Sequence, residues 1–136
     1  EEIVVFFDND RAGIDASEVD YINAHGTSTV LNDKYETMGS KKAFKEAAYG
    51  INISSTKSMT GHALGAAGVN EAIFCLLMLQ NSFIAPSINI DELDEHAKSF
   101  DIVANVARET KLETVMSNSF GFGGTNASLI LRNYHG

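Results

Sequence analysis

The chain has 136 residues, of which 44% are hydrophobic and 21% are charged, and these proportions are typical of a globular protein with one domain over residues 1–136. Its formal net charge of −8 argues against a nucleic-acid-binding surface, and its longest apolar run, Ile73 to Leu79, is too short to cross a bilayer. Cys75 is the only cysteine, so disulfides and cysteine-rich metal sites are excluded and a reducing, cytoplasmic compartment is expected.

The chain starts abruptly in apolar sequence, with Glu1 in place of an initiator methionine, and residues 3–10 fit either a helix or a strand. We interpret the chain as a piece of a longer protein. A native terminus that follows processing is the alternative.

The first strand that the sequence predicts covers residues 19–24, which are rich in β-branched and aromatic side chains. It leads into a loop of glycine and hydroxyl residues that begins at His25. Asn32 and Asp33 are then expected to cap a helix over residues 34–48.

Two groups of charged residues lie on this expected helix. Lys41, Lys42 and Lys45 form the one basic cluster of the chain, a pattern that is more often a solvated helix face than a binding surface. Asp33 and Glu36, three residues apart at the helix start, are interpreted as capping residues that complement the helix dipole. Contact with a functional site is the alternative for these two carboxylates.

A second polar loop, residues 54–62, lies between a strand expected over 51–55 and a helix expected over 64–80. It contains Lys57 and His62 among hydroxyl and glycine residues. Reactive groups placed between two buried elements are typical of a catalytic loop, and a polar turn with a surface lysine is the alternative. The helix is nearly apolar all round in its second half, so it is expected to be buried.

The remaining segments are an extended segment over 85–90, an acidic loop or short helix over 91–100, a strand over 101–103, and a hairpin of strands over 114–118 and 127–132 around a glycine-rich loop. The order of strands and helices predicts an α/β layered domain with a mixed sheet flanked by helices. Ligands of such sheets bind at the carboxyl ends of strands, so His25, the loop of Lys57 and His62, and Phe122 are expected to meet at one edge.

His25 and His62 each stand beside a glycine in a loop after a strand. Two neutral imidazoles can donate hydrogen bonds to one carbonyl oxygen and stabilise an enolate or an oxyanion. A zinc pair is the competing interpretation, but the two histidines are 37 positions apart and no third ligand has a suitable spacing.

Glu71 lies inside the apolar helix, where an unpaired charge would be costly, and Lys57 is the best candidate for its partner. A position on a solvent-exposed face of the helix is the alternative for Glu71. Cys75 lies in the middle of the same helix between Phe74 and Leu76, where cysteine behaves as a small hydrophobic residue rather than a nucleophile.

Three segments follow a known family pattern in its order: Val19-Asp20-Tyr21-Ile22-Asn23-Ala24-His25-Gly26-Thr27-Ser28-Thr29, Ser55-Thr56-Lys57-Ser58-Met59-Thr60-Gly61-His62 and Ser117-Asn118-Ser119-Phe120-Gly121-Phe122-Gly123-Gly124-Thr125-Asn126. Together they resemble the C-terminal half of a β-ketoacyl-acyl-carrier-protein synthase of the thiolase-like superfamily. The similarity runs from about Ala12 to Arg132, whereas residues 1–11 match poorly. The stretch from Leu76 to Glu95 is most similar to the type I synthase, and Val30 stands where the family usually has proline.

The resemblance implies fatty-acid chain elongation by a decarboxylating Claisen condensation between malonyl-carrier protein and an acyl thioester. His25 and His62 would hold the malonyl thioester oxygen and stabilise the enolate. Lys57 would adjust the electrostatics of the site, paired with Glu71.

The resemblance also assigns residues to the substrate. Thr27 and Thr29 would hydrogen-bond the phosphopantetheine arm, which arrives with the carrier protein, and Phe120 would line the substrate site. Phe122 would act as a gate beside the nucleophile, with its backbone N–H in the oxyanion hole. No metal and no separate cofactor is implied.

The nucleophilic cysteine of the family lies in the N-terminal half, and Cys75 does not occupy its motif, so the isolated chain is expected to be inactive. The implied partners are an acyl-carrier protein, the missing N-terminal half and a second subunit in a homodimer, with no nucleic acid and no membrane. Because carrier proteins are acidic, the basic docking surface is expected on the missing half or on the dimer mate. A non-catalytic partner or structural module on the same fold is the alternative function, although His25, Lys57 and His62 are all retained.

Overall fold

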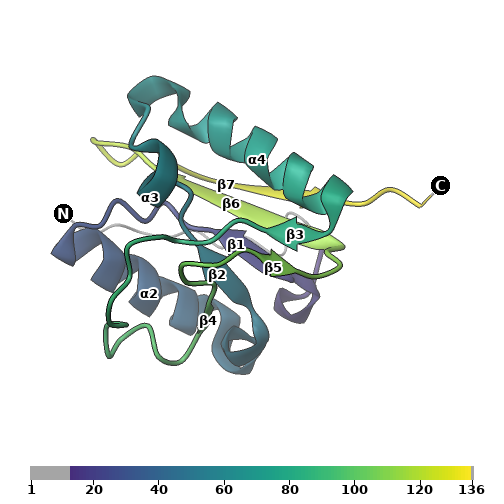
Figure 1. Cartoon of the computed structure of the whole chain (residues 1–136), viewed down its shortest axis with the longest axis horizontal. Helices are drawn as coiled ribbons and strands as arrows, with labels where there is room; N and C mark the ends of the chain where they lie inside the picture. Colours follow the sequence, from purple (N-terminus) through teal and green to yellow (C-terminus); the bar gives the residue numbers. More distant parts are fainter. Residues whose placement is uncertain (1–12, 136) are drawn as a thin grey trace.

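The computed structural model describes residues 13–135, so the ambiguous segment over 3–10 lies outside the described residues (Figure 1). The α-helices are α2 (Val30–Phe44), α3 (Lys57–Thr60) and α4 (Ala67–Asn81), and the 3-10 helices are η1 (Ala16–Glu18), η2 (Lys45–Gly50) and η3 (Leu64–Ala66). The strands are β1 (Tyr21–Asn23), β2 (Asn52–Ser54), β3 (Phe83–Ile84), β4 (Asp101–Ile102), β5 (Arg108–Glu109), β6 (Thr114–Phe120) and β7 (Asn126–Arg132).

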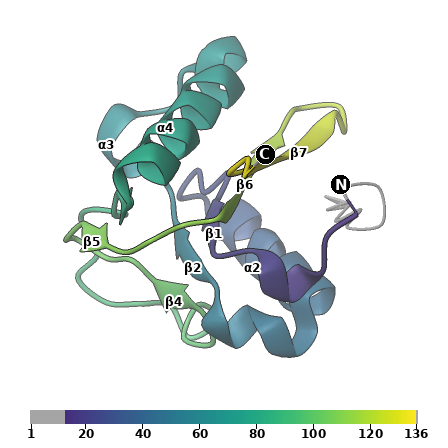
Figure 2. The same cartoon turned by 90° about the vertical axis from the view of Figure 1, so that its right-hand side faces the viewer.

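Five strands form the central sheet in the order β4-β2-β1-β6-β7. β1 pairs in parallel with β2 and β6, and β2 pairs in parallel with β4, whereas β7 returns antiparallel to β6 as the second strand of the predicted hairpin. Figure 2 shows α4 and α2 on opposite faces of this sheet. The predicted α/β domain with a mixed sheet flanked by helices is therefore confirmed.

Each face of the sheet has its own hydrophobic core, because successive residues of a strand point to opposite faces. On the α4 face, Tyr21 is buried in a cluster that includes Cys75. On the α2 face, Ile22 is buried with Phe44 and Met116. Both cores meet at β1, so the loop that follows this strand is supported from both sides of the sheet.

Helix α2 begins and ends four residues earlier than the helix predicted over 34–48. The N-cap is Thr29, whose side-chain oxygen accepts a hydrogen bond from the backbone N–H of Asn32, so the expected caps Asn32 and Asp33 lie inside the first turn. Lys45 ends the helix at a φ of +50°, which is outside the helical region, and the chain continues as η2.

Other elements also differ from the prediction. The polar loop over 54–62 contains the one-turn helix α3, the helix expected over 64–80 opens with η3, and the segment over 91–100 forms turns without a helix. Strands β3 and β5 were not predicted, because two residues are too few for alternation to be visible in the sequence. The other strands were predicted within one or two residues of their bounds.

Helix α4 is buried on one side only in the described part of the chain. Cys75 faces the sheet, whereas Val69, Ile73 and Leu77 are 65%, 49% and 46% exposed. By length and composition alone, the 18-residue segment Leu64–Asn81 with its mean hydropathy of 1.2 could cross a membrane, but the core helix of a larger globular protein passes the same test. The prediction of a buried helix therefore holds for one face, and an apolar face remains open.

Candidate active site

The loop after β1 turns sharply because glycine follows His25. Gly26 has a φ of +38°, and a Cβ added to it would lie 2.5 Å from the Cβ of Ser55, so a larger residue does not fit. The hydroxyl of Ser55 donates a hydrogen bond of 2.8 Å to the carbonyl oxygen of Gly26. The loops after β1 and β2 are therefore held against each other.

A carboxylate from α2 supports the same loop. Oε1 of Glu36 accepts the backbone N–H of His25 and Oε2 accepts that of Gly26, each at 2.9 Å. Asn118, in β6, donates a hydrogen bond of 3.4 Å from its Nδ2 to Oε1 of Glu36. Glu36 is buried, and burial raises the pKa of its carboxyl although the two amide donors favour the charged form. Of the two interpretations of Glu36, contact with the site is the one that the structure supports.

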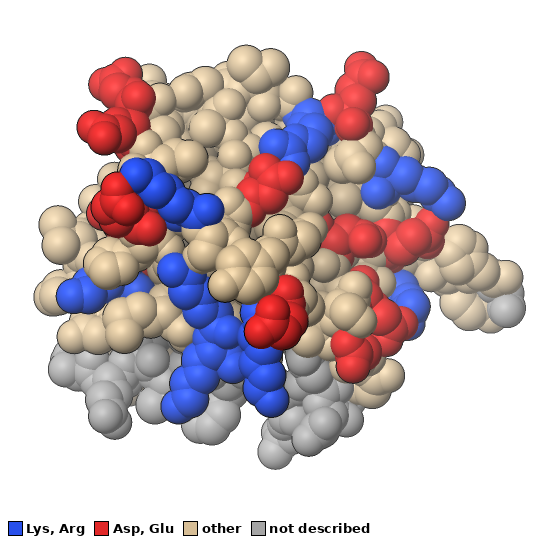
Figure 3. Space-filling view, turned by 90° about the horizontal axis from the view of Figure 1, so that it is seen from below, with Lys and Arg blue, Asp and Glu red and all other residues tan. Residues whose placement is uncertain are grey.

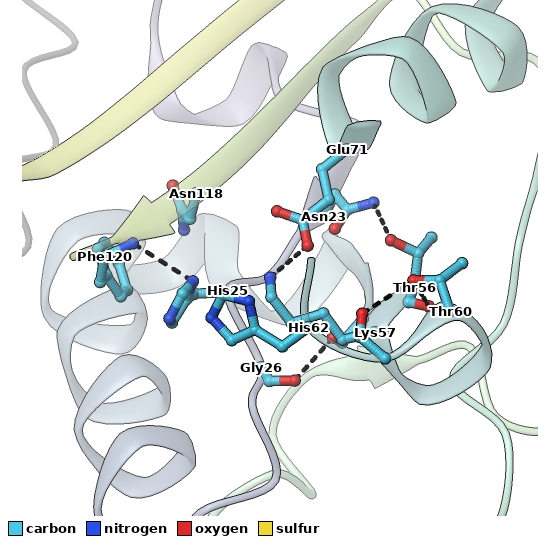
Figure 4. Close-up of polar contacts among 12 residues, drawn as sticks. Asn23, His25, Gly26, Thr56, Lys57, Thr60, His62, Glu71, Asn118 and Phe120 are labelled. Carbon is cyan, nitrogen blue, oxygen red and sulfur yellow. Dashed lines mark hydrogen bonds and ion pairs between the residues drawn. The ribbon is translucent and has the colours of Figure 1, made fainter. Parts of the chain in front are cut away.

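The predicted pairing of Lys57 with Glu71 is confirmed. Nζ of Lys57, in α3, forms an ion pair with Oε1 of Glu71, in α4, and both side chains are buried. Oε2 of Glu71 is buried without a hydrogen-bond partner among the described residues. Burial raises the pKa of Glu71, and the Lys57 ammonium opposes this shift. The pair ties α3 to α4 and places a positive charge close to the histidines (Figure 4).

His62 enters the site from the turn after α3. Gly61, at a φ of +72°, ends that helix, and the chain then turns again at Leu64, whose φ is +52°. The backbone N–H of Leu64 donates a hydrogen bond of 3.0 Å to Nδ1 of His62. Since Nδ1 is the acceptor, the neutral ring carries its proton on Nε2.

His25 has the same tautomer for the same reason. The backbone N–H of Phe120, in β6, donates to Nδ1 of His25 at 3.3 Å. The ring centroids of His25 and His62 lie 5.5 Å apart with their planes at 84°, and the Phe120 ring lies 5.4 Å from that of His25 (Figure 4). Two imidazoles from different loops therefore meet, each with an Nε2–H donor, as the positions of the loops after the strands predicted.

We expect His25 to titrate far below an ordinary histidine. Burial, followed by the charges of Lys57 and His62, lowers its pKa from 6.5 to about 4. The unfolded chain therefore takes up this proton at a higher pH than the folded chain does. The contribution of His25 to stability falls as the pH drops from 6.5 to 4. NMR titration with labelled histidine should show the low midpoint, and a midpoint near 6.5 would contradict it; loss of the signal in His25→Gln provides the assignment.

The other predicted site residues are placed less centrally. The hydroxyls of Thr27 and Thr29 lie 3.3 Å apart at the start of α2. Phe122 is fully exposed in the turn between β6 and β7, and the structure does not bring it to the histidines. The aromatic ring that contacts His25 is that of Phe120.

Cys75 is buried in α4, and burial raises the pKa of its thiol to about 12. The thiol is therefore held protonated and is poorly suited to nucleophilic attack. In residues 13–135 no group of three or more histidine, cysteine, aspartate or glutamate side chains could hold a metal ion.

A cavity of about 800 Å³ lies on the α2 side of the sheet. Gly26, Thr29 and Glu36 line it, but His25 and His62 do not. A molecule in this cavity would touch the supports of the His25 loop rather than the imidazoles, so we place the chemistry at the histidines.

Ser55 and Asn118 were not predicted as supports of the loop, and Glu36 was interpreted mainly as a capping residue. One signal was available, because Asn32, Glu36 and Phe44 fall at multiples of four on the stripe of α2 that is buried. A stripe of that spacing identifies the inner face of a helix even where its residues are polar. The contact of Asn118 with Glu36 has no such local signal, since 82 positions separate the two.

Comparisons with known proteins give one consistent set of matches. The domain described as "Beta-ketoacyl synthase, C-terminal domain" matches residues 9–91. The chain is 58% identical over 118 residues to the 3-oxoacyl-(acyl-carrier-protein) synthase 1 of Haemophilus influenzae. The match covers 87% of this chain and 29% of that protein. It is 55% identical over 120 residues to the protein of the same name from Escherichia coli K12, and this match covers 88% of this chain and 29% of that protein.

Solved structures give the same result. A β-ketoacyl synthase from Burkholderia phymatum superposes with a TM-score of 0.85 at 40% identity over 93% of this chain and 30% of that one. A chain in the AntDE:AntF complex, described as an acyl-carrier protein with its ketosynthase, superposes with a TM-score of 0.89 at 35% identity. The match covers 93% of this chain and 31% of that one. The chain spans about 29% of the length of the curated relatives that it matches.

Proposed function

Because this chain belongs to the β-ketoacyl synthase family, as its C-terminal domain, we propose that it supplies the histidine and lysine half of an active site for fatty-acid chain elongation. The reaction is a decarboxylating Claisen condensation of malonyl-carrier protein with an acyl thioester. The nucleophilic cysteine comes from the missing N-terminal half, so the chain is inactive alone.

The observation that carries the proposal is the contact between the two imidazoles, each with its proton on Nε2. When malonyl thioester loses carbon dioxide, the electron pair of the broken C–C bond moves into the thioester and forms an enolate. Two Nε2–H donors stabilise the developing negative charge on the enolate oxygen. His25 suits this role because it is neutral at pH 7 and therefore remains a hydrogen-bond donor without becoming an acid.

The enolate carbon then attacks the carbonyl carbon of the acyl group on the cysteine of the other half. A new C–C bond forms, the C–S bond breaks, and the cysteine leaves as a thiolate. Lys57 contributes positive charge from its position beside Glu71. We assign Thr27 and Thr29 to the phosphopantetheine arm, and Phe120 and Phe122 to the acyl side of the site.

The proposal includes three partners: the N-terminal half, the carrier protein and a second subunit in a cytoplasmic homodimer. The N-terminal half is supported by the open apolar face of α4, on which Val69, Ile73 and Leu77 are exposed. The carrier protein is supported by the names of the relatives and by the AntDE:AntF complex. The free, buried Cys75 is compatible with a reducing compartment.

The test needs the missing half. In the Haemophilus influenzae synthase, the 118-residue part that matches this chain is replaced by this chain; we call the product the chimera. We expect the chimera to release carbon dioxide from malonyl-carrier protein, and His25→Ala or His62→Ala to lower that rate by about 10²–10³-fold, the usual effect of removing one donor from an oxyanion site.

His96→Ala provides the control, since His96 lies on an exposed part of the acidic segment. Its rate should stay within a factor of two of the unmodified chimera. If both His25→Ala and His62→Ala left decarboxylation unchanged, the enzymatic function would be wrong and a structural module on the same fold would be the better description.

A further inference from the structure

The segment over residues 85–90, which we call the strap, borders the loop that carries Lys57 and His62. It leaves β3 and runs past α3 before the acidic segment begins (Figure 1). The strap is neither helix nor strand, apart from a single parallel bridge between Ser87 and Ala104. A segment of this kind can position a catalytic loop if its own backbone is fixed and if it bonds to that loop.

The backbone of the strap is fixed by the chain that follows β4. The N–H of Ser87 donates to the carbonyl oxygen of Val103 at 2.9 Å, and the carbonyl oxygen of Ser87 accepts the N–H of Asn105 at 2.7 Å. The side-chain amide of Asn105 bonds both backbone groups of Ile90, since Oδ1 accepts the N–H at 3.1 Å and Nδ2 donates to the carbonyl oxygen at 2.7 Å. Ser87 is therefore anchored on both sides.

The strap bonds to the loop over residues 54–62 through serine hydroxyls. Three hydrogen bonds run from Oγ of Ser54 to the carbonyl oxygen of Ala85 (2.6 Å), from the N–H of Ser55 to Oγ of Ser87 (2.8 Å) and from the N–H of Ile88 to Oγ of Ser58 (2.9 Å). Each bond joins residues 30 to 32 positions apart. They therefore fix where the loop lies in the fold rather than its local shape.

Ser55 connects the strap to the loops of both histidines. Its N–H is held by Ser87, and its own hydroxyl donates to the carbonyl oxygen of Gly26, beside His25, at 2.8 Å. Its carbonyl oxygen accepts the hydroxyl of Ser58, in α3, at 2.9 Å. A shift of Ser55 would therefore move the loop after β1 and the start of α3 together.

Helix α3 depends on such external support. It has four residues, and no side chain caps its N-terminus at Thr56. A single helical turn is unstable by itself, because fixing its backbone costs more than its few hydrogen bonds return. The pair of Lys57 and Glu71 holds α3 on the side of α4, and the serines hold it on the side of the strap. His62 follows directly after this helix and its Gly61 cap, so its position depends on both supports.

The strap holds the loop without charged groups. Its sequence is Ala-Pro-Ser-Ile-Asn-Ile, whereas lysine and arginine side chains lie among aspartate and glutamate side chains on the face seen in Figure 3. Salt screens exposed ion pairs but has little effect on hydrogen bonds between neutral groups. Loss of a strap hydroxyl should therefore have the same effect at low and at high salt.

We propose that Ser87 is a positioning residue of the reaction, because its hydroxyl fixes Ser55 and, through Ser55, the loops of both histidines. The inference rests on the proposed function for the chemistry that the loops perform. Removal of the hydroxyl leaves the half-buried N–H of Ser55 without its acceptor. The backbone bonds of Ser87 to Val103 and Asn105 do not involve the side chain, so the strap itself should stay in place.

The test compares Ser87→Ala with Ser87→Thr in the chimera. Threonine keeps the hydroxyl and suits extended backbone, and Ser87 lines the cavity of about 800 Å³, which leaves room for one more methyl group. Ser87→Ala should lower kcat for decarboxylation of malonyl-carrier protein about tenfold and change KM less than twofold, since a small misplacement of reacting groups costs rate. Ser87→Thr should keep kcat within a factor of two.

Ser99→Ala is the matched control. Ser99 is half-buried like Ser87, but its hydroxyl oxygen has no hydrogen-bond partner among the described residues, so kcat should stay within a factor of two. Two further measurements do not require turnover. Ser87→Ala should speed hydrogen exchange of the Ser55 amide at least tenfold, and the titration midpoint of His25 should move toward 6.5 as its loop loosens.

The positioning role would be overturned by an unchanged kcat in Ser87→Ala, by a loss of equal size in Ser99→Ala, or by a loss that Ser87→Thr does not restore. Unchanged hydrogen exchange of Ser55 in Ser87→Ala would overturn it as well. An unmodified chimera without activity would instead contradict the proposed function. The exchange and titration measurements would then still decide whether Ser87 holds the two loops.

Discussion

Replacing Lys57 by methionine should destabilise the folded protein by about 3–5 kcal/mol, because removal of one member of a buried ion pair leaves the other charge uncompensated. Glu71 is 3% exposed, and its second oxygen already lacks a hydrogen-bond partner among the described residues. Methionine approximates the length of the lysine stem, so the loss should come from charge rather than from volume. The urea midpoint of the chimera measures the effect.

The loss should depend on pH in a defined direction. Without Lys57 the main opposition to the effect of burial is lost and only the charge of His62 still lowers the pKa of Glu71, so this pKa should rise further above its ordinary value in Lys57→Met. A raised carboxyl pKa means that the folded state holds the proton more tightly than the unfolded state. The variant should therefore recover stability as the pH falls toward the ordinary pKa of glutamate, and its deficit should be largest above the raised pKa of Glu71.

The double variant Lys57→Met with Glu71→Leu separates stability from chemistry. It removes both charges, so its free energy of unfolding by urea should return to within about 1 kcal/mol of the original. Apolar residues often replace a buried ion pair without loss of stability. Its decarboxylation rate should be lower than that of the unmodified chimera. The pKa of His25 should rise, because the Lys57 charge is one of the causes that lower it. Full activity in the double variant would show that the pair is structural only.

The same pair illustrates what the sequence could predict. A carboxylate in the middle of an apolar helix needs a cation, and Lys57 was the lysine nearest in sequence, so solvation energy alone identified the partner. The meeting of His25 with the Lys57 and His62 loop followed from a topological rule, since the carboxyl ends of parallel strands share one edge of a sheet. Both contacts could be predicted because they depend on the composition and order of the elements rather than on exact geometry.

The parts that were not predicted depend on geometry that no local pattern records. The support of the His25 loop by Glu36 required the true start of α2, and the stronger capping signal at Asn32 and Asp33 concealed the cap at Thr29. Phe122 was expected at the same edge, but the turn between β6 and β7 leaves it exposed, and its role as a gate remains a prediction. The two-residue strands had no periodicity to detect.

Glu36→Ala should have the second large effect, and it should act on the site through the backbone. The carboxylate accepts the N–H groups of His25 and Gly26 at 2.9 Å each, and a hydrogen bond to a charged acceptor contributes about 1.5–3 kcal/mol. Alanine removes the acceptor for both amides, of which that of His25 is buried and that of Gly26 half-buried, so we expect a loss of about 3 kcal/mol or more in the free energy of unfolding by urea. Glu46→Ala, an exposed carboxylate beyond the end of α2, should change it by less than about 0.5 kcal/mol.

Glu36→Gln discriminates between a positioning role and simple filling of space. Glutamine has the same shape, but only its Oε1 can accept, so its Nε2 amide group would face one of the two N–H donors. We therefore expect decarboxylation to decrease in the order Glu36, Glu36→Gln, Glu36→Ala, mainly in kcat, with the pKa of His25 moving back toward its ordinary value as the loop loosens. A glutamine variant with full kcat and an unchanged His25 titration would mean that the loop holds itself, through Gly26 and its contact with Ser55, and that Glu36 contributes only to stability.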